Sequence, residues 1–212
     1  MTTSAPAPAR SARPRKPRQG DLRNALIDAG IALLDSGGPD ALTLRGCAAG
    51  AGVSHAAPAH HFNGLPGLRA AIAGRGYALF TACMIEHRRR APPRPDARLL
   101  AICEGYLRFS REHPALFALM FNTDVDLAAD PAAQEQAGAA YRVLVEGCAP
   151  FAGDGRDAAT TEVMVWSLVH GFACLRNAGR RRGTAGGDSW PDFGGILSWL
   201  LTPGDRPAPG EG

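Results

Sequence analysis

The sequence predicts an all-α protein. Apolar residues recur at helical spacing through most of the 212-residue chain, and no segment shows a convincing alternation of apolar and polar residues. Glycine and proline, 26 and 17 residues respectively, cluster between the helical segments, where they end helices. A hydrophobic content of 45% is enough for a packed core. We therefore expect helices joined by short loops, without a sheet.

The first helix is predicted over residues 21–36. Its apolar positions form one stripe: Leu22, Ala25, Leu26, Ala29 and Leu33. The sequence Gly-Gly-Pro at 37–39 ends it, because glycine and proline do not continue a helix.

Residues 42–62, LTLRGCAAGAGVSHAAPAHHF, match two short helices joined by a tight turn. Thr43 is a good N-cap for a helix that begins at Leu44, and Gly52 can adopt the left-handed conformation that the turn requires. Ser54 is expected to cap a second helix over residues 55–61. Pro58 lies inside that helix, but so near its start that the loss is about one hydrogen bond. This spacing is typical of a helix-turn-helix DNA reader.

Further helices are predicted over residues 65–90, 96–112, 114–121, 131–149, 156–180 and 190–201. The helix at 65–90 is the longest, and the prolines at 92, 93 and 95 mark its end. It should link the first helices to a second domain.

Residues 1–20 form a basic arm. They contain five cations and no acid, whereas the whole chain has a formal net charge of only +3. Prolines and alanines around the charges oppose a packed core, so the free arm should be flexible. One interpretation is a solubilising tail. The other is a DNA contact made by Arg15, Lys16 and Arg18 through phosphates or a minor groove.

Several classes of function find no support in the sequence. It has no apolar signal-peptide stretch and no run of about eighteen uncharged apolar residues, so we expect a cytoplasmic protein without a membrane partner. Motifs for phosphate binding, nucleophilic catalysis and metal binding are absent, so we expect neither an enzyme nor a cofactor. The three histidines at 55, 60 and 61 lack metal-ligand spacing.

The cysteines are expected to be reduced core residues. They are odd in number, scattered, and lack a C-x-x-C pair: Cys47, Cys83, Cys103, Cys148 and Cys174. A redox sensor is the alternative interpretation.

At this point the chain resembles the TetR family of bacterial one-component transcription regulators. The resemblance rests on LLDSGG at 33–38, LTLR at 42–45, AGVS at 51–54 and HF at 61–62, and it covers residues 21–75. HPALF at 113–117 and WSLVHG at 166–171 resemble, more weakly, the C-terminal domain of a subgroup with a Trp, His and Gly cluster. The family implies a homodimer that binds double-stranded DNA and is released from it by a small effector.

The resemblance places the recognition helix at residues 54–61. Candidate DNA contacts are Thr43, Arg45, Ser54, His55, Ala56, Ala57, His60 and His61, with the basic arm. Thr43 and Arg45 would contact phosphates, although Arg45 could also reach a base edge. The chain departs from the family pattern at Ala59, where an aromatic residue is usual, and at residues 63–67, which lack the frequent lysine.

Two further sets of residues are expected in the C-terminal domain. An apolar or aromatic effector would be bound by residues from Phe80, Cys83, Met84, Cys103, Tyr106, Phe109, Phe117, Met120, Phe121, Trp166 and His170, although most could simply be core. The helix around Trp166 is apolar on two faces, which suits a helix packed against a second subunit. The dimer candidates are Val165, Leu168, Phe172, Leu175, Ile196, Trp199 and Leu200.

The predicted organisation is an arm (1–20), a helix-turn-helix domain (21–64), an effector-binding and dimerisation domain (65–203) and a tail (204–212). The function predicted is a repressor that binds a pseudo-palindromic operator as a dimer. The alternative is a ligand-sensing or protein-interaction dimer whose head does not bind DNA.

Overall fold

The computed structural model describes residues 19–153, 157–179 and 190–201, which form helices and turns without a β-strand. The all-α prediction is confirmed. The α-helices are α1 (Gln19–Gly37), α2 (Leu44–Gly50), α3 (Gly64–Arg90), α4 (Pro95–Glu112), α5 (Pro114–Met120), α6 (Pro131–Cys148), α7 (Ala158–Asn177) and α8 (Phe193–Leu201). Short 3₁₀-helices are η1 (Pro39–Ala41), η2 (Ala57–His60), η3 (Leu127–Ala129) and η4 (Ala149–Phe151).

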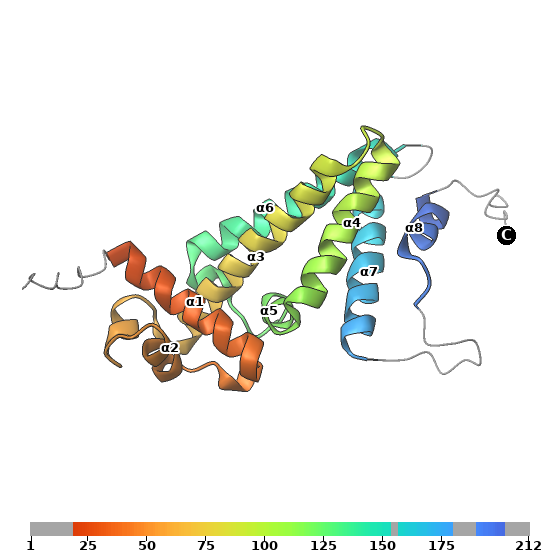
Figure 1. Ribbon diagram of the computed structural model, residues 1–212. Coiled ribbons are helices and arrows are strands. Elements are labelled where there is room, and N and C mark those ends of the chain that lie inside the picture. The colour runs from red at the N-terminus through yellow and green to blue at the C-terminus, as the bar shows by residue number, and fades with distance from the viewer. Residues whose placement is uncertain (1–18, 154–156, 180–189, 202–212) are drawn as a thin grey trace, which may run out of the picture.

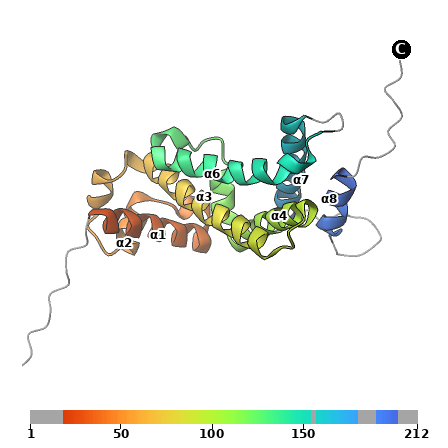
Figure 2. The same ribbon diagram turned by 90° about the horizontal axis from the view of Figure 1, so that it is seen from above.

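The molecule is elongated, with α1 and α2 at one end and α7 and α8 at the other (Figure 1). Helix α3 runs between the two ends, and α6 lies beside it in both views (Figures 1 and 2). One hydrophobic core follows this axis: Leu26 and Leu34 belong to it at the α1 end, and Val165 and Leu197 at the other. The two ends are thus joined by continuous packing, through which a displacement at one end can reach the other.

Glycine allows α3 and α6 to approach closely. A Cβ atom built on Gly74 of α3 would lie 2.7 Å from the Cα and 2.8 Å from the Cβ of Ala133 in α6. The obstacle is mostly backbone, which cannot rotate away as a flexible side chain would. Residue 74 therefore fixes the distance between these two helices.

We expect Gly74→Ala to lower the free energy of unfolding by about 1–3 kcal/mol, because the added methyl group overpacks this contact. Chemical denaturation would measure the change. The matched control is Gly138→Ala in α6, where the nearest atom to a new Cβ is Arg142 Nη1 at 3.5 Å. That change should stabilise the protein by up to about 1 kcal/mol through helix propensity. Equal effects of the two substitutions would contradict the close-approach argument.

The cysteine prediction holds in part. All five thiols are free, and Cys47, Cys103 and Cys148 are buried. Cys174 is different, because it lies exposed on α7. It lies on the side of α7 that does not pack against the rest of the subunit, so it is not a core residue.

Helix α7 also bears on the expected absence of a membrane span. Among the described residues it is the one helix long and apolar enough to cross a membrane, with a mean hydropathy of 1.3. A single helix of this kind is weak evidence, since helices of soluble proteins pass the same test. Here α7 packs against α4 and α6, with Val165 and Val169 buried, and Phe172 packs against Trp190 and Phe193.

Candidate functional site

The head is formed by α1 and α2, and Thr43 caps α2, as predicted. Thr43 has an extended backbone (φ −135°, ψ 149°), and its hydroxyl oxygen accepts a 3.0 Å hydrogen bond from the backbone N–H of Gly46. Gly46 is closely surrounded, because a Cβ there would lie 2.9 Å from that same oxygen and 3.0 Å from Leu33 Cδ1. After α2 the chain turns at Gly52, whose φ of +67° lies in the left-handed region. The cap at Thr43 and the turn at Gly52 thus place residues 54–61 beside α2.

The predicted recognition helix at residues 55–61 is wrong in detail. The segment 54–61, here called the reading segment, holds only the single 3₁₀ turn η2. Pro58 is the reason: it has no N–H to donate to the carbonyl of Ser54, which accepts instead from Ala57 at 3.0 Å. The N-cap of η2 is Ala56, which makes no side-chain cap bond, so Ser54 does not cap this turn as predicted. The ring of Pro58 is buried and anchors the segment to the head.

Most candidate DNA contacts lie on the surface of the head. The exposed ones are Thr43, Arg45, Ser54, His55, Ala56 and His60. Ala57 and His61 are half-buried, and the imidazole of His61 lies 6.3 Å from the ring of Phe62. The arm residues Arg15, Lys16 and Arg18 lie outside the described part of the chain.

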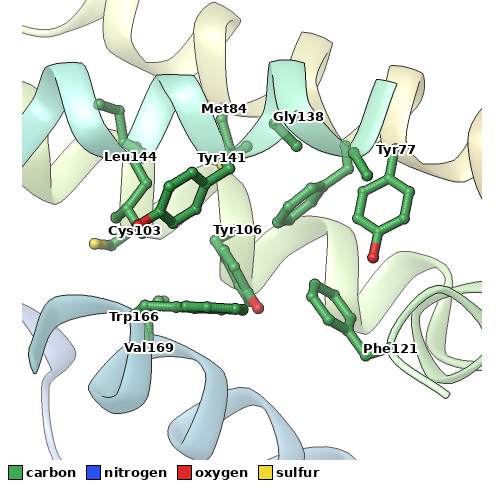
Figure 3. Close-up of a pocket in the computed structure, with 14 residues that line it drawn as sticks. Tyr77, Met84, Cys103, Tyr106, Phe121, Gly138, Tyr141, Leu144, Trp166 and Val169 are labelled. Carbon is green, nitrogen blue, oxygen red and sulfur yellow. The ribbon is translucent and has the colours of Figure 1, made fainter. Parts of the chain in front are cut away.

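An apolar pocket of about 310 Å³ lies between α3, α4, α6 and α7 (Figure 3). It is lined by Tyr77, Phe80, Met84, Ile102, Cys103, Tyr106, Phe121, Ala137, Gly138, Ala140, Tyr141, Leu144, Trp166 and Val169. None of these 14 side chains is charged. Tyr141 and Trp166 are 43% and 40% exposed, with ring centroids 5.9 Å apart, and they form its rim.

The structure brings together six of the eleven predicted effector residues: Phe80, Met84, Cys103, Tyr106, Phe121 and Trp166. Phe109, Phe117 and Met120 are buried in the core beside the pocket, and the Cys83 thiol donates to the carbonyl of Gly105 at 3.3 Å. His170 does not line the pocket, but it contacts Tyr106, which does. Sequence reasoning missed the contribution of α6, whose small residues at 137, 138 and 140 leave the space open; that run of small side chains was the available signal.

The three phenols of the pocket already have hydrogen-bond partners. The Tyr77 hydroxyl donates to the carbonyl of Met120 at 2.7 Å, and Tyr141 donates to Glu162 at 2.8 Å. Tyr106 Oη and His170 Nδ1 share a 2.7 Å hydrogen bond, and His170 Nε2 lies 3.4 Å from the sulfur of Cys174. Burial raises the pKa of Tyr106 far above its ordinary value and that of Tyr77 to about 12. Both phenols therefore stay neutral.

Burial lowers the pKa of His170 below its ordinary value of 6.5. As the pH falls below about 6.5, the unfolded chain binds a proton at this histidine before the folded chain does. We therefore expect the free energy of unfolding to decrease with acidification through this range. His170→Gln should remove that part of the pH dependence, measured as the difference between the unfolding curves of the two proteins at pH 5 to 8. Parallel pH profiles would contradict the assignment.

The dimer candidates divide into buried and exposed residues. Val165 and Phe172 are 0% and 7% exposed, so they pack inside the subunit. Leu168, Ile196 and Leu200 are half-buried. Leu175 of α7 and Trp199 of α8 are 50% and 81% exposed, and Val163, which is 56% exposed, is a further exposed apolar residue of α7. Exposed apolar area of this kind is typical of a protein interface.

Metal binding finds no geometric support. No group of three or more His, Cys, Asp or Glu side chains that could hold a metal ion occurs within the described ranges.

Comparison with known proteins agrees with this architecture. Residues 99–190 match a family model described as the tetracyclin repressor-like C-terminal domain. No curated protein sequence matches the chain significantly. A solved protein of unknown function from Rhodococcus sp. RHA1 is 28% identical, with a TM-score of 0.70, covering 90% of this chain and 95% of that one.

Two solved TetR family transcription regulators have the same fold. The one from Marinobacter aquaeolei VT8 is 14% identical with a TM-score of 0.58, covering 85% of this chain and 94% of that one. The putative regulator from Shewanella sp. PV-4 is 13% identical with a TM-score of 0.58, covering 85% and 95%. The matched C-terminal domain, joined to a helical head, supports a transcription regulator as the class of this protein. The resemblance to the TetR family that the sequence motifs predicted is confirmed over residues 99–190, which match that family's C-terminal domain. The chain's assignment to the subgroup with the Trp, His and Gly cluster stays a prediction.

Proposed function

We propose that this regulator is a cytoplasmic repressor that binds a pseudo-palindromic operator as a homodimer and is released by a small uncharged effector. The proposed function includes no enzymatic activity. Residues 21–64 form the DNA-binding domain and residues 65–203 the effector-binding and dimerisation domain. Residues 1–20 and 204–212 form the arm and the tail.

The observation that carries the proposal is the combination of a capped, exposed head with an apolar pocket in one continuous core. On the head, Arg45 is a cation and Thr43 a hydroxyl donor for phosphate, and His55 and His60 are exposed for base edges. In a two-fold dimer, two such heads would contact half-sites about 34–36 Å apart or a little more.

The lining of the pocket supports an uncharged apolar or aromatic effector. A charged ligand would lose its hydration there without meeting an opposite charge, which costs several kcal/mol. A bound ligand would press on α3 and α6. A tilt of α3 would change the separation of the two heads and thereby weaken DNA binding.

The test is selection of bound fragments from a random duplex library, followed by affinity measurements at two salt concentrations on the enriched sequence and a scrambled duplex. An enriched inverted repeat with salt-dependent affinity would support the proposal. The control is Arg45→Ala, which should weaken both duplexes by a similar factor and reduce the salt slope by about one. Absence of any enrichment would contradict DNA reading.

A second candidate function is a ligand-sensing or protein-interaction dimer whose head does not bind DNA. The observation that favours it is η2, because one 3₁₀ turn offers less surface to a major groove than a recognition helix. Ala59 in place of an aromatic residue, and the absence of a lysine at residues 63–67, also favour this alternative. Low-salt binding without sequence preference would favour this alternative.

A further inference from the structure

Arg23 of α1 joins three parts of the molecule. Its guanidinium forms an ion pair with Asp130, the residue before α6. The same guanidinium lies over the ring of Phe62, with the carbon Cζ 5.4 Å from the ring centroid. Phe62 directly follows the reading segment. One side chain thus contacts both the end of the reading segment and the start of a pocket helix.

Asp130 is a firm anchor for this contact. Its carboxylate oxygen Oδ1 accepts hydrogen bonds from the backbone N–H groups of Ala132 at 3.0 Å and Ala133 at 3.4 Å, so it caps α6. The Asp130 side chain is only 11% exposed. The oxygen Oδ2 pairs with Arg23. The position of Arg23 is therefore tied to the first turn of α6.

The reading segment has only short-range backbone hydrogen bonds of its own, so side-chain contacts from neighbouring elements contribute to its position. It contains one 3₁₀ turn, and Pro58 removes one donor. The ring of Phe62 is 7% exposed and fixes where the segment ends. A planar cation stacked on this ring restrains it from the side of α1.

We propose that Arg23 is a positioning residue that fixes the reading segment to α6, so that a displacement of the pocket wall is transmitted to the DNA-reading surface. Ala137, Gly138 and Tyr141 of α6 line the pocket two to three turns after Asp130. The connection bypasses α3. This inference rests on the proposed function for its meaning, but the contact itself can be tested without DNA or effector.

Loss of the ion pair should leave the fold intact. Helix α1 is also held by Arg75 of α3, which donates to Asp28 at 3.0 Å and to Asn24 at 2.9 Å. Its buried residues Leu26 and Ile27 remain in the core. A variant can therefore separate positioning from stability.

The experiment is hydrogen–deuterium exchange on the full chain, comparing the wild type with Asp130→Asn. Asparagine is as good an N-cap as aspartate, so the substitution keeps the cap of α6 and removes the charge that pairs with Arg23. We expect exchange in residues 54–62 to accelerate about fivefold, with α2 and the centre of α6 unchanged.

The matched control is Asp126→Asn, four residues earlier. Asp126 caps η3 by accepting from Ala128 N at 3.0 Å and has no arginine partner among the described contacts. This control should leave residues 54–62 unchanged. Arg23→Gln should reproduce the effect of Asp130→Asn, and the double variant should add nothing further.

Two results would overturn the proposal. Unchanged exchange in residues 54–62 would show that Arg23 does not position the segment. A uniform acceleration over α1, α2 and α6 would show a role in stability alone. Failure of the wild type to bind any DNA would instead refute the proposed function, while the exchange result would still decide the positioning role.

Discussion

Leu175→Glu is expected to convert the proposed dimer into a monomer and to lower operator affinity at least about a hundredfold, because the two heads would no longer bind together. Leu175 is 50% exposed near the C-terminal end of α7, and Val163, which is 56% exposed, adds apolar surface to the same helix. In a two-fold interface both subunits carry the new charge, and each would have to lose its hydration. Sedimentation at micromolar concentration would measure the mass.

The control for this result is Leu79→Glu. Leu79 is 43% exposed, so the two positions are matched in residue type, exposure and charge change, but Leu79 lies on α3 rather than α7. We expect this variant to keep the mass and the operator affinity of the wild type. If Leu175→Glu also sedimented like the wild type at every concentration, the exposed apolar surface of α7 would not be the dimer interface.

Local signals explain why most of the fold could be predicted. Prolines stand within the first residues of α4, α5 and α6, and Asp130 and Thr43 cap their helices. Each of these effects acts over a few residues, so it can be read without knowledge of the partner helices. The reading segment is the exception. Pro58 was expected to cost one hydrogen bond, but in so short a segment that bond was enough to decide between an α-helix and one 3₁₀ turn.

The wall of the pocket formed by α3 and α4 could be predicted from the sequence, whereas the wall formed by α6 could not. Aromatic residues of α3 and α4 were recognisable as candidates, because large apolar side chains line most ligand pockets. Whether each of these aromatic residues borders the cavity or packs into the core depends on the residues of the opposite wall. That wall is α6, where Ala137, Gly138 and Ala140 leave the space that Phe80 and Tyr106 border. The Arg23–Asp130 ion pair could not be predicted either, because the two residues lie 107 positions apart in the sequence.

Naphthalene is expected to bind in the pocket at least about a hundredfold more tightly than 2-naphthoate, which is the same ring system with a carboxylate. The pocket of about 310 Å³ offers aromatic edges and aliphatic side chains to a flat ligand. The carboxylate would enter a site whose lining carries no cation. His170 does not supply one at neutral pH, because burial lowers its pKa.

Titration calorimetry would measure both affinities, and Trp166 on the rim offers a fluorescence signal for the same event. The blocking variant is Ala140→Phe, which should fill the pocket from α6 and abolish naphthalene binding, with thermal melting as the check that it folds. Its partner is Ala139→Phe, one residue earlier on α6 and not in the lining, which should bind naphthalene like the wild type. Equal binding of the two ligands, with 2-naphthoate also lost in Ala140→Phe, would show that the pocket neutralises an anion. The explanation that the pocket disfavours charged ligands because of their desolvation cost would then be wrong.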